Sequence, residues 1–490
     1  MLFNSYEFIF LFLPVTVIGY YLLNRIRLTL ASNAWLLFAS LFFYCWWDIR
    51  YLPLLLGSIL FNYTIGNLLV DYDSNRKNVI SRKSIFISGL VGNLVLLGVF
   101  KYTDFVIANM NALAGTRFEL LKIVLPLGIS FFTITQIAFL VDCYEGLVKE
   151  RKLLNYSLFV TFFPHLLAGP ILHHKEMMPQ FDRVRNKVLN YRNLCIGSYV
   201  FFIGLFKKII IADSFSGVVA NGFDTAKSLN GVEGWVASLS YTLQLYYDFS
   251  GYSDMAVGVG LMFNIVLPWN FNSPYKSANV IQFWQRWHMT LSNFITTYLY
   301  SPILRASRSI TFSRSLVAIF VAMLISGVWH GAGWNFVIWG ALHGAALVIN
   351  HYWRKKKIKM PTVLAWLITF LFVNVSFVFF RAKGIPEALK VLKAMAGLGA
   401  PVFPEKHSAV TLNAFTHSQI WKEILINLQG RDSTFWLLLV ILAFTFIAKN
   451  SIQLADTFKP DWKRFAFLLS IALYAILNMG KVSEFLYFQF

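Results

Sequence analysis

Residues 315–349, SLVAIFVAMLISGVWHGAGWNFVIWGALHGAALVI, place an ionisable side chain, His330, inside a long apolar run. The residues before Gly327 suit a lipid-facing or buried helix, and a second apolar run begins at Phe336. An ionisable group at the depth of a membrane is costly and usually faces a protein interior or a wet cavity. The stretch therefore predicts membrane-embedded helices and marks His330 as a candidate functional residue.

The composition of the whole chain is typical of a membrane protein. Of its 490 residues, 57% are hydrophobic and 13% are charged, whereas soluble domains carry about 25% charged residues. Apolar blocks recur from end to end, and a helix needs roughly 20 such residues to cross the hydrocarbon core. We expect an all-α polytopic membrane protein with about 11–12 transmembrane helices and short interfacial or re-entrant helices.

The domain organisation is predicted to be simple, because the chain has no internal repeat and no low-complexity tract. We expect residues 1–490 to form a single integral membrane domain with a polar loop at about 398–433, longer than most loops. Just before this loop, residues 385–399 carry apolar side chains at helical spacing with lysines between them. This pattern predicts a helix docked at the membrane interface.

The net charge of +20 comes from 43 Lys and Arg against 23 Asp and Glu. Basic residues gather in short loops between apolar blocks, at 24–27, 74–83, 149–152 and 354–359. The positive-inside rule places these loops in the cytoplasm, and their alternation predicts an external N-terminus. Such clusters orient spans and attract anionic lipid headgroups, which argues against nucleic acid as a partner. The first apolar segment lacks the marks of a cleaved signal peptide and is expected to be retained.

Common catalytic and metal-binding motifs are missing from the sequence. Cys45, Cys143 and Cys195 form no CxxC pair, and neither HExxH nor a His/Cys cluster at ligand spacing predicts zinc. The sequence has no GxSxG elbow for a serine nucleophile and no P-loop for nucleotide hydrolysis. We therefore expect no metal site.

Polar side chains concentrate in three consecutive regions, 241–258, 270–294 and 327–335, where hydropathy predicts none. Asp248 and Asp254 lie in the first region, and an Asp at the centre of a span costs roughly 2.5–3.5 kcal/mol on insertion scales. The pattern predicts one shared cavity. Either aspartate could line that cavity or could cap or bridge a broken helix.

Several histidines have a purely structural interpretation. His173 and His174, beside Lys175 at a membrane edge, are expected to be solvated loop residues. His343 is expected to be a packing residue with satisfied hydrogen bonds, and His165 to mark a broken or re-entrant segment.

His288 and His330 are the histidines that suit catalysis. An imidazole in an apolar site stays neutral at physiological pH, because burial disfavours its charged form. A neutral imidazole can remove a proton from an attacking hydroxyl, and no metal is needed when the electrophile is already activated, as a thioester is.

Four motifs give the chain a specific resemblance: YYDFSGYSDMAVGVGLM at 246–262, NFNSPY at 270–275, FWQRWHMTLSNF at 283–294 and GVWHG at 327–331. They resemble membrane-bound O-acyltransferases (MBOAT), and most of all the bacterial branch that acetylates polysaccharides such as alginate. Similar proteins serve peptidoglycan O-acetylation, and a relative serves D-alanylation of teichoic acids. The resemblance covers nearly the whole chain and implies a ring of helices with a central tunnel.

The resemblance also implies roles for individual residues. His330 matches the histidine that is the proposed general base, and His288 matches a second histidine expected to orient substrate or to stabilise the thioester carbonyl oxygen. Six further candidates for substrate binding, four of them motif positions that line the site in relatives, are Arg286, Trp287, Asn272, Tyr252, Asp248 and Trp329.

The implied reaction is acyl transfer to a hydroxyl, with acetyl-CoA as donor and no permanently bound cofactor. The implied acceptor is an extracytoplasmic glycan, acetylated directly or through an SGNH-type partner acyltransferase, and the implied location is the bacterial inner membrane. The chain departs from the branch at Gln285, where an arginine is usual, and at Thr296 and Thr297, where Arg-Asp is usual.

Two alternative functions stay open at this point. Intramembrane Asp and His residues suit a proton-coupled transporter equally well, although transporters usually show paired repeats that this chain lacks. D-alanyl transfer to teichoic acid is the other alternative, because that activity occurs in the same family.

Overall fold

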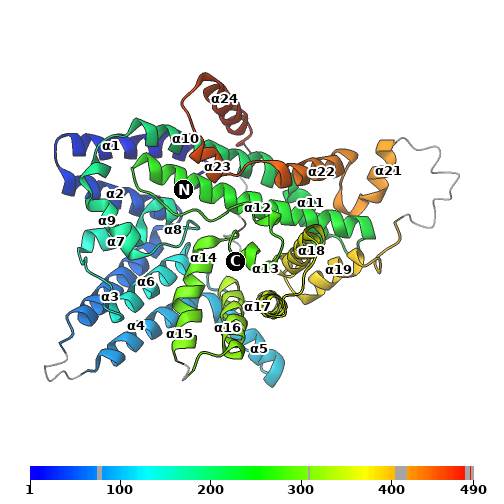
Figure 1. The fold of residues 1–490 in the computed structure, drawn as a ribbon, viewed down its shortest axis with the longest axis horizontal. Coiled ribbons are helices and arrows are strands. Elements are labelled where there is room, and N and C mark those ends of the chain that lie inside the picture. The colour runs from blue at the N-terminus through cyan, green and yellow to red at the C-terminus, as the bar shows by residue number, and fades with distance from the viewer. Residues whose placement is uncertain (74–79, 307–308, 403–416, 481–485, 487–490) are drawn as a thin grey trace. The chain divides into compact units, whose positions relative to one another are not determined.

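The computed structural model describes residues 1–73, 80–306, 309–402, 417–480 and 486. Within these ranges every regular element is a helix, and the β-type pairing is confined to an isolated bridge between Asn230 and Ala400 (Figure 1). This confirms the predicted all-α fold. The physical reason is that a chain in hydrocarbon has to satisfy its backbone hydrogen bonds within each segment.

The chain divides into two compact units, each assembled from segments that are distant in sequence. Unit 1 comprises Met1–Leu205, Tyr252–Trp269 and Ala455–Val482, and unit 2 comprises Phe206–Gly251, Asn270–Leu454 and Ser483–Phe490. Helix α12 (Gly231–Met262) contributes its first part to unit 2 and its last part to unit 1. The single domain expected from the sequence stays a prediction.

Unit 1 is helical throughout its described residues, and its core is rich in phenylalanine. Phe8 lies 5.9 Å from Phe43 and 6.1 Å from Phe163 between ring centroids, so three segments meet at one aromatic cluster. The elements of unit 1 are η1 (Phe8–Phe12), α1 (Leu13–Arg25), α2 (Thr29–Cys45), η2 (Ile49–Tyr51), α3 (Leu52–Val70), α4 (Arg82–Leu97), η3 (Gly98–Tyr102), α5 (Thr103–Ala114), α6 (Ile129–Tyr144), α7 (Leu153–Thr161), α8 (Phe163–Leu166), α9 (His174–Asp182), η4 (Val184–Lys187), α10 (Tyr191–Phe206, to Leu205), α23 (Ser451–Asp456, from Ala455) and α24 (Trp462–Leu477).

One histidine prediction fails in unit 1. His174 is buried, and its Nδ1 lies 2.7 Å from a carboxylate oxygen of buried Asp142. The prediction that His174 is a solvated loop residue is therefore wrong. Its interaction with Asp142 of α6 offsets the free-energy cost of burying the imidazole. His165 is buried on the short helix α8, which follows a break at Phe162, as predicted.

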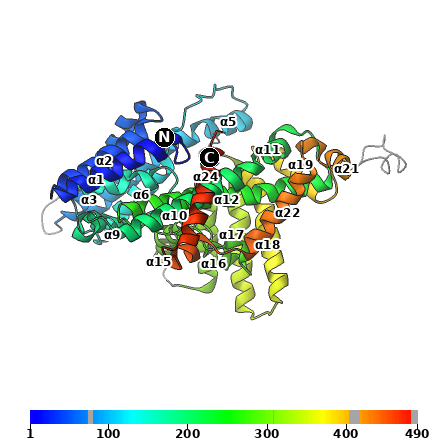
Figure 2. The same ribbon diagram turned by 90° about the horizontal axis from the view of Figure 1, so that it is seen from above.

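Unit 2 contains most of the three polar regions, 241–258, 270–294 and 327–335. Residues 252–258 belong to unit 1. In both views α17 runs beside α16 and α18, and the contacts agree (Figure 2). The elements of unit 2, besides the first part of α12, are η5 (Lys207–Ala212), η6 (Asp213–Phe215), α11 (Ser216–Ala220), η7 (Asn221–Thr225), η8 (Pro274–Lys276), α13 (Val280–Trp284), α14 (Met289–Ile295), η9 (Thr296–Tyr300), α15 (Ser301–Arg305), α16 (Phe312–His330), α17 (Trp334–Lys355), α18 (Thr362–Arg381), α19 (Ile385–Met395), α21 (His417–Ile424), η10 (Ile426–Leu428) and α22 (Asp432–Ile447).

The predicted docked helix within 385–399 is α19, whose Ala388, Val391 and Ala394 are buried. Of the polar loop expected at 398–433, residues 403–416 lie outside the described residues. The described part of that loop includes α21 and η10.

Six helical stretches in the described residues are long and apolar enough to cross a membrane: Phe8–Arg25, Ile49–Val70, Arg82–Ala114, Tyr191–Thr225, Phe312–His330 and Thr362–Arg381. Thr29–Cys45, Ile129–Tyr144 and Asp432–Ile447 are apolar but shorter. These helices support a multi-pass membrane protein. The expected total of 11–12 spans and the ring with a central tunnel stay predictions.

Helices α16 and α17 approach each other closely because glycines face each other between them. A Cβ on Gly327 would lie 2.4 Å from the carbonyl oxygen of Phe336, and one on Gly340 would lie 2.7 Å from that of Met323. Small residues let helix backbones come into contact in this way inside membranes. This packing positions His330, the last residue of α16.

We predict that Gly340→Leu separates α16 from α17 and lowers the free energy of unfolding by about 1–3 kcal/mol, the usual cost of overpacking. Thermal unfolding of the protein in detergent measures the change. Gly57→Leu is the matched control, because a Cβ added to Gly57 in helix α3 would meet no neighbouring side chain or other segment within 4 Å. Equal Tm values for the two variants would contradict the packing argument.

Candidate functional site

His330 is held by aromatic rings at the C-terminal end of α16. Its ring is nearly perpendicular to that of Trp339, with centroids 5.1 Å apart, and lies 5.3 Å from Phe380 and 4.9 Å from Trp329. The residue is only 6% exposed. These edge-to-face contacts fix the plane of the imidazole in an apolar shell.

The short connection after His330 depends on glycine. A Cβ on Gly331 would lie 2.1 Å from the ring of Phe336, so a side chain there would push the start of α17 away. Gly331 itself is extended, and α17 begins at Trp334. The GVWHG motif thus places the histidine and the next helix in direct contact.

His288 occupies a strained position in unit 2. Its φ of 43° lies in the left-handed region, which non-glycine residues rarely adopt and which is concentrated at functional sites. It directly precedes α14 and is 1% exposed, with its ring 4.7 Å from that of Phe249.

Asn270 fixes the tautomer of His288. The side-chain oxygen of Asn270 lies 3.2 Å from His288 Nδ1 and also accepts a hydrogen bond of 2.6 Å from the hydroxyl of Thr290. Because an amide oxygen only accepts, Nδ1 carries the proton and Nε2 keeps its lone pair. Nε2 is buried and has no hydrogen-bond partner among the residues that the structure describes.

His288 lies in the connection between two short helices, outside the long apolar helices. Burial lowers the pKa of its imidazole to about 3. The ring is therefore neutral at physiological pH, and the lone pair of its buried Nε2 carries no proton.

The two imidazoles belong to the same aromatic core of unit 2. A continuous series of ring contacts, each 6.0 Å or shorter between centroids, joins them in the order His330, Trp339, Trp284, Phe283, Trp287, Phe271, Phe249 and His288. All three regions of the sequence predicted to share a cavity thus contribute to one packed layer.

His343 is a packing residue of this core, as predicted. Its Nδ1 lies 3.2 Å from the indole nitrogen of Trp284, which donates, and its Nε2 lies 2.9 Å from the hydroxyl of Ser376. Both ring nitrogens are satisfied, so His343 fixes Trp284 within the aromatic layer.

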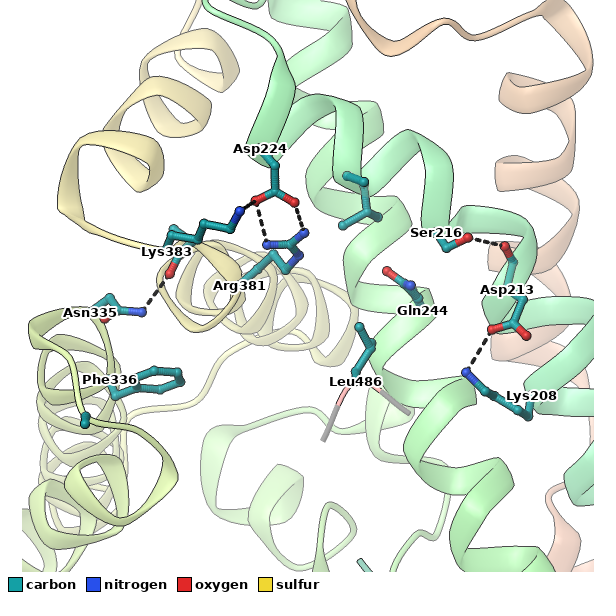
Figure 3. A pocket seen from close by; sticks show the side chains of 14 residues that line it. Lys208, Asp213, Ser216, Asp224, Gln244, Asn335, Phe336, Arg381, Lys383 and Leu486 are labelled. Atoms are coloured by element: carbon teal, nitrogen blue, oxygen red, sulfur yellow. Dashed lines mark hydrogen bonds and ion pairs between the residues drawn. The ribbon is translucent and has the colours of Figure 1, made fainter. Parts of the chain in front are cut away.

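A cavity of about 640 Å³ opens beside the His330 end of this layer, and all of its lining residues belong to unit 2. Figure 3 shows charged side chains on its walls, with Gln244 and Leu486 between them. The lining comprises Lys208, Asp213, Ser216, Val219, Ala220, Asp224, Gln244, Ala332, Asn335, Phe336, Arg381, Ala382, Lys383 and Leu486.

A second cavity of about 230 Å³ lies farther along α17. Phe336 lines the first cavity and Leu347 the second, which separates them by about 16 Å along the helix axis. The lining of the second cavity comprises Trp284, Ser292, Ile295, Thr296, Tyr300, Ile319, Ala322, Met323, Leu347 and His351. Trp284, which belongs to the aromatic layer, therefore forms part of its wall.

Asp248 is part of a buried ion cluster. Lys208 Nζ lies 2.7 Å from a carboxylate oxygen of Asp248 and 2.9 Å from one of Asp213, and the backbone N–H of Leu486 donates to Asp248. Lys208, Asp213 and Leu486 line the larger cavity, whereas Asp248 contacts Lys208 and Leu486 without lining it. Asp248 lies inside the continuous helix α12 and is absent from the cavity lining, so among the described residues it neither caps a broken helix nor lines this cavity.

The remaining predicted residues are dispersed. Trp329 contacts the ring of His330, whereas Trp287 is buried in the aromatic core, stacked on Phe283. Asn272 is exposed and accepts a hydrogen bond from Asn450, and its backbone N–H donates to the carbonyl of Arg286.

Tyr252 belongs to unit 1, where its ring stacks on that of Phe3. The structure thus brings His330 and Trp329 together and places Tyr252 in another set of contacts. The substrate-binding roles of all six candidates stay predictions.

Sequence reasoning missed Asn270, Lys208 and Arg381. Asn270 stands in the NFNSPY motif two positions before Asn272, the residue predicted to bind substrate. Only the contact of Asn270 with His288 in the structure reveals its importance. Lys208 and Arg381 end or interrupt apolar helices, a position where cations are also common as simple membrane anchors.

Comparison with known proteins identifies related sequences. Residues 119–385 match the membrane-bound O-acyltransferase (MBOAT) family. The chain is 45% identical to a peptidoglycan O-acetyltransferase of Helicobacter pylori, over 100% of this chain and 98% of that protein.

Two further relatives have other named activities. A probable alginate O-acetylase of Pseudomonas aeruginosa is 38% identical over 81% of this chain and 75% of that protein. A teichoic acid D-alanyltransferase of Bacillus subtilis is 29% identical over 52% of this chain and 69% of that protein.

We predict that Asn270→Ala destabilises unit 2 by about 2–4 kcal/mol, because it leaves the buried Nδ1–H of His288 and the hydroxyl of Thr290 without their shared acceptor. Thermal unfolding in detergent checks the size of the effect. Asn272→Ala removes the same side chain two positions away at an exposed site and should cost at most about 1 kcal/mol, the usual net value of its hydrogen bond with Asn450. A small loss in both variants would contradict the assigned role of Asn270.

Proposed function

Because the chain belongs to the membrane-bound O-acyltransferase family, we propose that it moves an acetyl group from cytosolic acetyl-CoA to hydroxyls of a polysaccharide outside the bacterial inner membrane. The chain is an O-acyltransferase with several membrane-spanning helices. Relatives named for the O-acetylation of peptidoglycan and alginate support the acyl group and the class of acceptor.

The observation that carries this proposal is the pair of cavities at different heights along α17. The basic loop 354–359 joins α17 to α18, and the positive-inside rule places it in the cytoplasm. The larger cavity is lined by the opposite ends of both helices, by Asn335 at the start of α17 and Arg381 at the end of α18. It therefore opens toward the external side, where the acceptor is.

The smaller cavity suits the donor. Its walls are mainly apolar, and it includes His351, four residues before the last residue of α17, Lys355, in the basic region. The narrow thioester arm of acetyl-CoA fits such a passage, and the cations of the loop suit the phosphates of the coenzyme. Trp339, which contacts His330, stands on α17 between Phe336 of the larger cavity and Leu347 of the smaller one.

His330 is the proposed general base. Its neutral imidazole accepts the proton of an acceptor hydroxyl as the oxygen attacks the thioester carbonyl carbon. The tetrahedral intermediate then breaks its carbon–sulfur bond, and the imidazolium returns the proton to the departing thiolate of coenzyme A. The products are an O-acetyl ester and the free thiol, and neither metal nor redox partner enters this sequence.

His288 is better suited to orienting substrate than to stabilising an oxyanion. Its Nδ1–H is committed to Asn270, so Nε2 can accept a hydrogen bond but cannot donate one in this tautomer. We propose that Nε2 accepts from a hydroxyl or amide of a bound substrate and aligns it. Of the two roles implied by the family resemblance, the geometry favours the first.

The acceptor is either the glycan itself or the serine of an external SGNH-type acyltransferase that passes the acetyl group on. An external N-terminus and the inner membrane as location complete the proposal. Both follow from the alternation of basic loops and from the bacterial origin of the named relatives.

We predict that His330→Gln reduces acetyl transfer by about 10²–10⁴-fold, the usual contribution of a general base. The assay uses protein reconstituted in liposomes, with radiolabelled acetyl-CoA outside and acceptor oligosaccharide inside. Acetyl transfer is then counted for the protein molecules whose basic loops face outward. His173→Gln, which removes a half-buried histidine of unit 1, should leave the rate unchanged.

Full activity of His330→Gln would reject the proposed base. Movement of polymer without cleavage of acetyl-CoA by the wild-type protein would instead support a transporter. A preference for D-alanyl over acetyl donors would support the teichoic acid alternative.

A further inference from the structure

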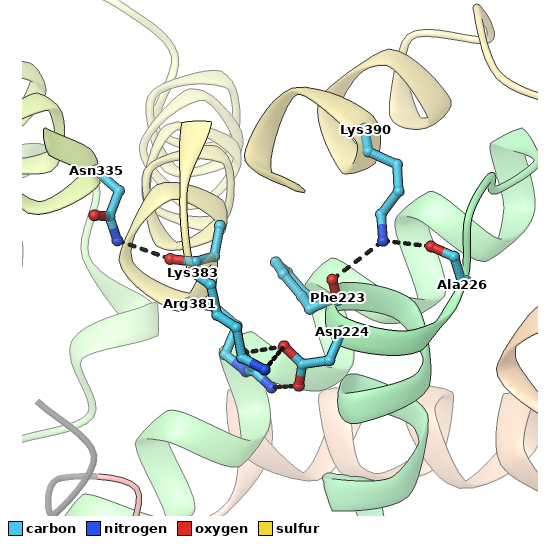
Figure 4. A network of polar contacts seen from close by, with 8 residues as sticks. Phe223, Asp224, Ala226, Asn335, Arg381, Lys383 and Lys390 are labelled. Atoms are coloured by element: carbon cyan, nitrogen blue, oxygen red, sulfur yellow. Dashed lines mark hydrogen bonds and ion pairs between the residues drawn. The ribbon is translucent and has the colours of Figure 1, made fainter. Parts of the chain in front are cut away.

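The larger cavity has a charged wall that the acyl-transfer chemistry does not use. Arg381 at the end of α18 contacts Asp224 of η7 at two points, with nitrogen–oxygen distances of 3.2 and 2.5 Å. Lys383 approaches the same carboxylate at 3.5 Å. Figure 4 shows both cations directed at this one aspartate, so two positive charges share a single negative charge.

The two cations, Arg381 and Lys383, differ in exposure and in mobility. The side chain of Arg381 is 12% exposed, and its Nε is buried without a hydrogen-bond partner in the described part of the chain. The side chain of Lys383 is 74% exposed and reaches solvent. One cation is thus fixed in the wall by Asp224, and the other can move at the cavity surface.

The other charged wall has the opposite balance. There Lys208 lies between two carboxylates, those of Asp213 and Asp248. Figure 3 shows Lys208 and Asp213 apart from Arg381 and Lys383, with Gln244 and Leu486 between the two groups. The cavity is therefore polarised, with its positive wall at the end of α18.

The positive wall is tied to the environment of His330. Phe380, the residue before Arg381, contacts the imidazole ring at 5.3 Å. Asn335 donates a hydrogen bond of 2.7 Å to the carbonyl of Ala382, which joins the start of α17 to the end of α18. A ligand group bound at Arg381 would therefore be held at a defined position relative to the proposed base.

The carboxylate partner of the wall is also fixed in place. On the far side of η7, Lys390 of α19 donates to the backbone carbonyls of Phe223 and Ala226 at 3.1 and 2.7 Å (Figure 4). These bonds hold the segment that carries Asp224. The site is thus built from three anchored elements rather than from loose surface charges.

We propose that Arg381 and Lys383 bind a carboxylate of the acceptor, so that the cavity selects an acidic glycan and sets one of its hydroxyls beside His330. This inference rests on the proposed acyl transfer and names the acceptor class. A guanidinium binds carboxylates in a geometry that ammonium groups and neutral donors do not match. A neutral acceptor leaves the excess positive charge of this wall without a partner.

The test compares two acceptors that differ in one functional group: a uronic-acid oligosaccharide and the same oligosaccharide with its carboxyl groups reduced to alcohols. Reconstituted wild-type protein with acetyl-CoA should show a KM about tenfold lower for the acidic acceptor, in line with a charge-assisted hydrogen bond. An acidic muropeptide, assayed in parallel, distinguishes a peptidoglycan-type source of the carboxylate from a uronate source.

Variants of the two cations carry the argument further. Lys383→Gln should raise the KM for the acidic acceptor about three- to tenfold, leave that for the reduced acceptor unchanged, and leave kcat nearly unchanged, whereas Lys383→Arg should restore the wild-type value. Arg381→Gln should have a larger effect of the same kind. Lys393→Gln is the matched control, because Lys393 is an exposed lysine of α19 that does not line the cavity.

Lys383 is exposed, so its variants remain informative even if Arg381→Gln does not fold. Equal KM values for both acceptors with the wild-type protein, or an equal loss for both in Lys383→Gln, would overturn the proposal. Transfer only to the serine of a partner protein would overturn it as well. Failure of the wild-type protein to use acetyl-CoA with any acceptor would instead reject the proposed function.

Discussion

A polar group surrounded by apolar atoms has to find its partner within the protein, and this constraint governs every part of the molecule. It makes the described chain helical, because only helices satisfy the backbone inside one segment. It pairs His174 with Asp142, and it places Lys208 between two carboxylates. His288 Nε2 and Arg381 Nε are among the buried side-chain atoms that have no such partner within the described residues.

The site combines a rigid aromatic layer with charged cavities. Rings on α16, α17 and α18 pack around His330, and the glycines between α16 and α17 allow the close approach that this packing needs. Charged residues are kept to the cavity wall at the helix ends, where Arg381 and Asp224 meet. The apolar layer keeps the imidazole of His288 neutral, and the charged wall is the proposed acceptor site.

The sequence predicts what depends on local pattern. Apolar periodicity revealed the all-α membrane fold and the helix α19, and the GVWHG motif marked His330. Sequence pattern alone could not show that His174 pairs with Asp142, 32 residues earlier, or that Asn270 orients His288, 18 residues later. Both are contacts between different elements. Two cations face Asp224 of η7: Arg381, the last residue of α18, and Lys383, two residues further along the chain. These residues come from separate parts of the sequence, so no local pattern reveals their contact with Asp224.

The burial of His288 has a consequence for how the protein responds to acid. Because burial holds the pKa of this ring at about 3, a fall to mildly acidic pH leaves the ring neutral. Any loss of activity in that range then has its origin in another titrating group.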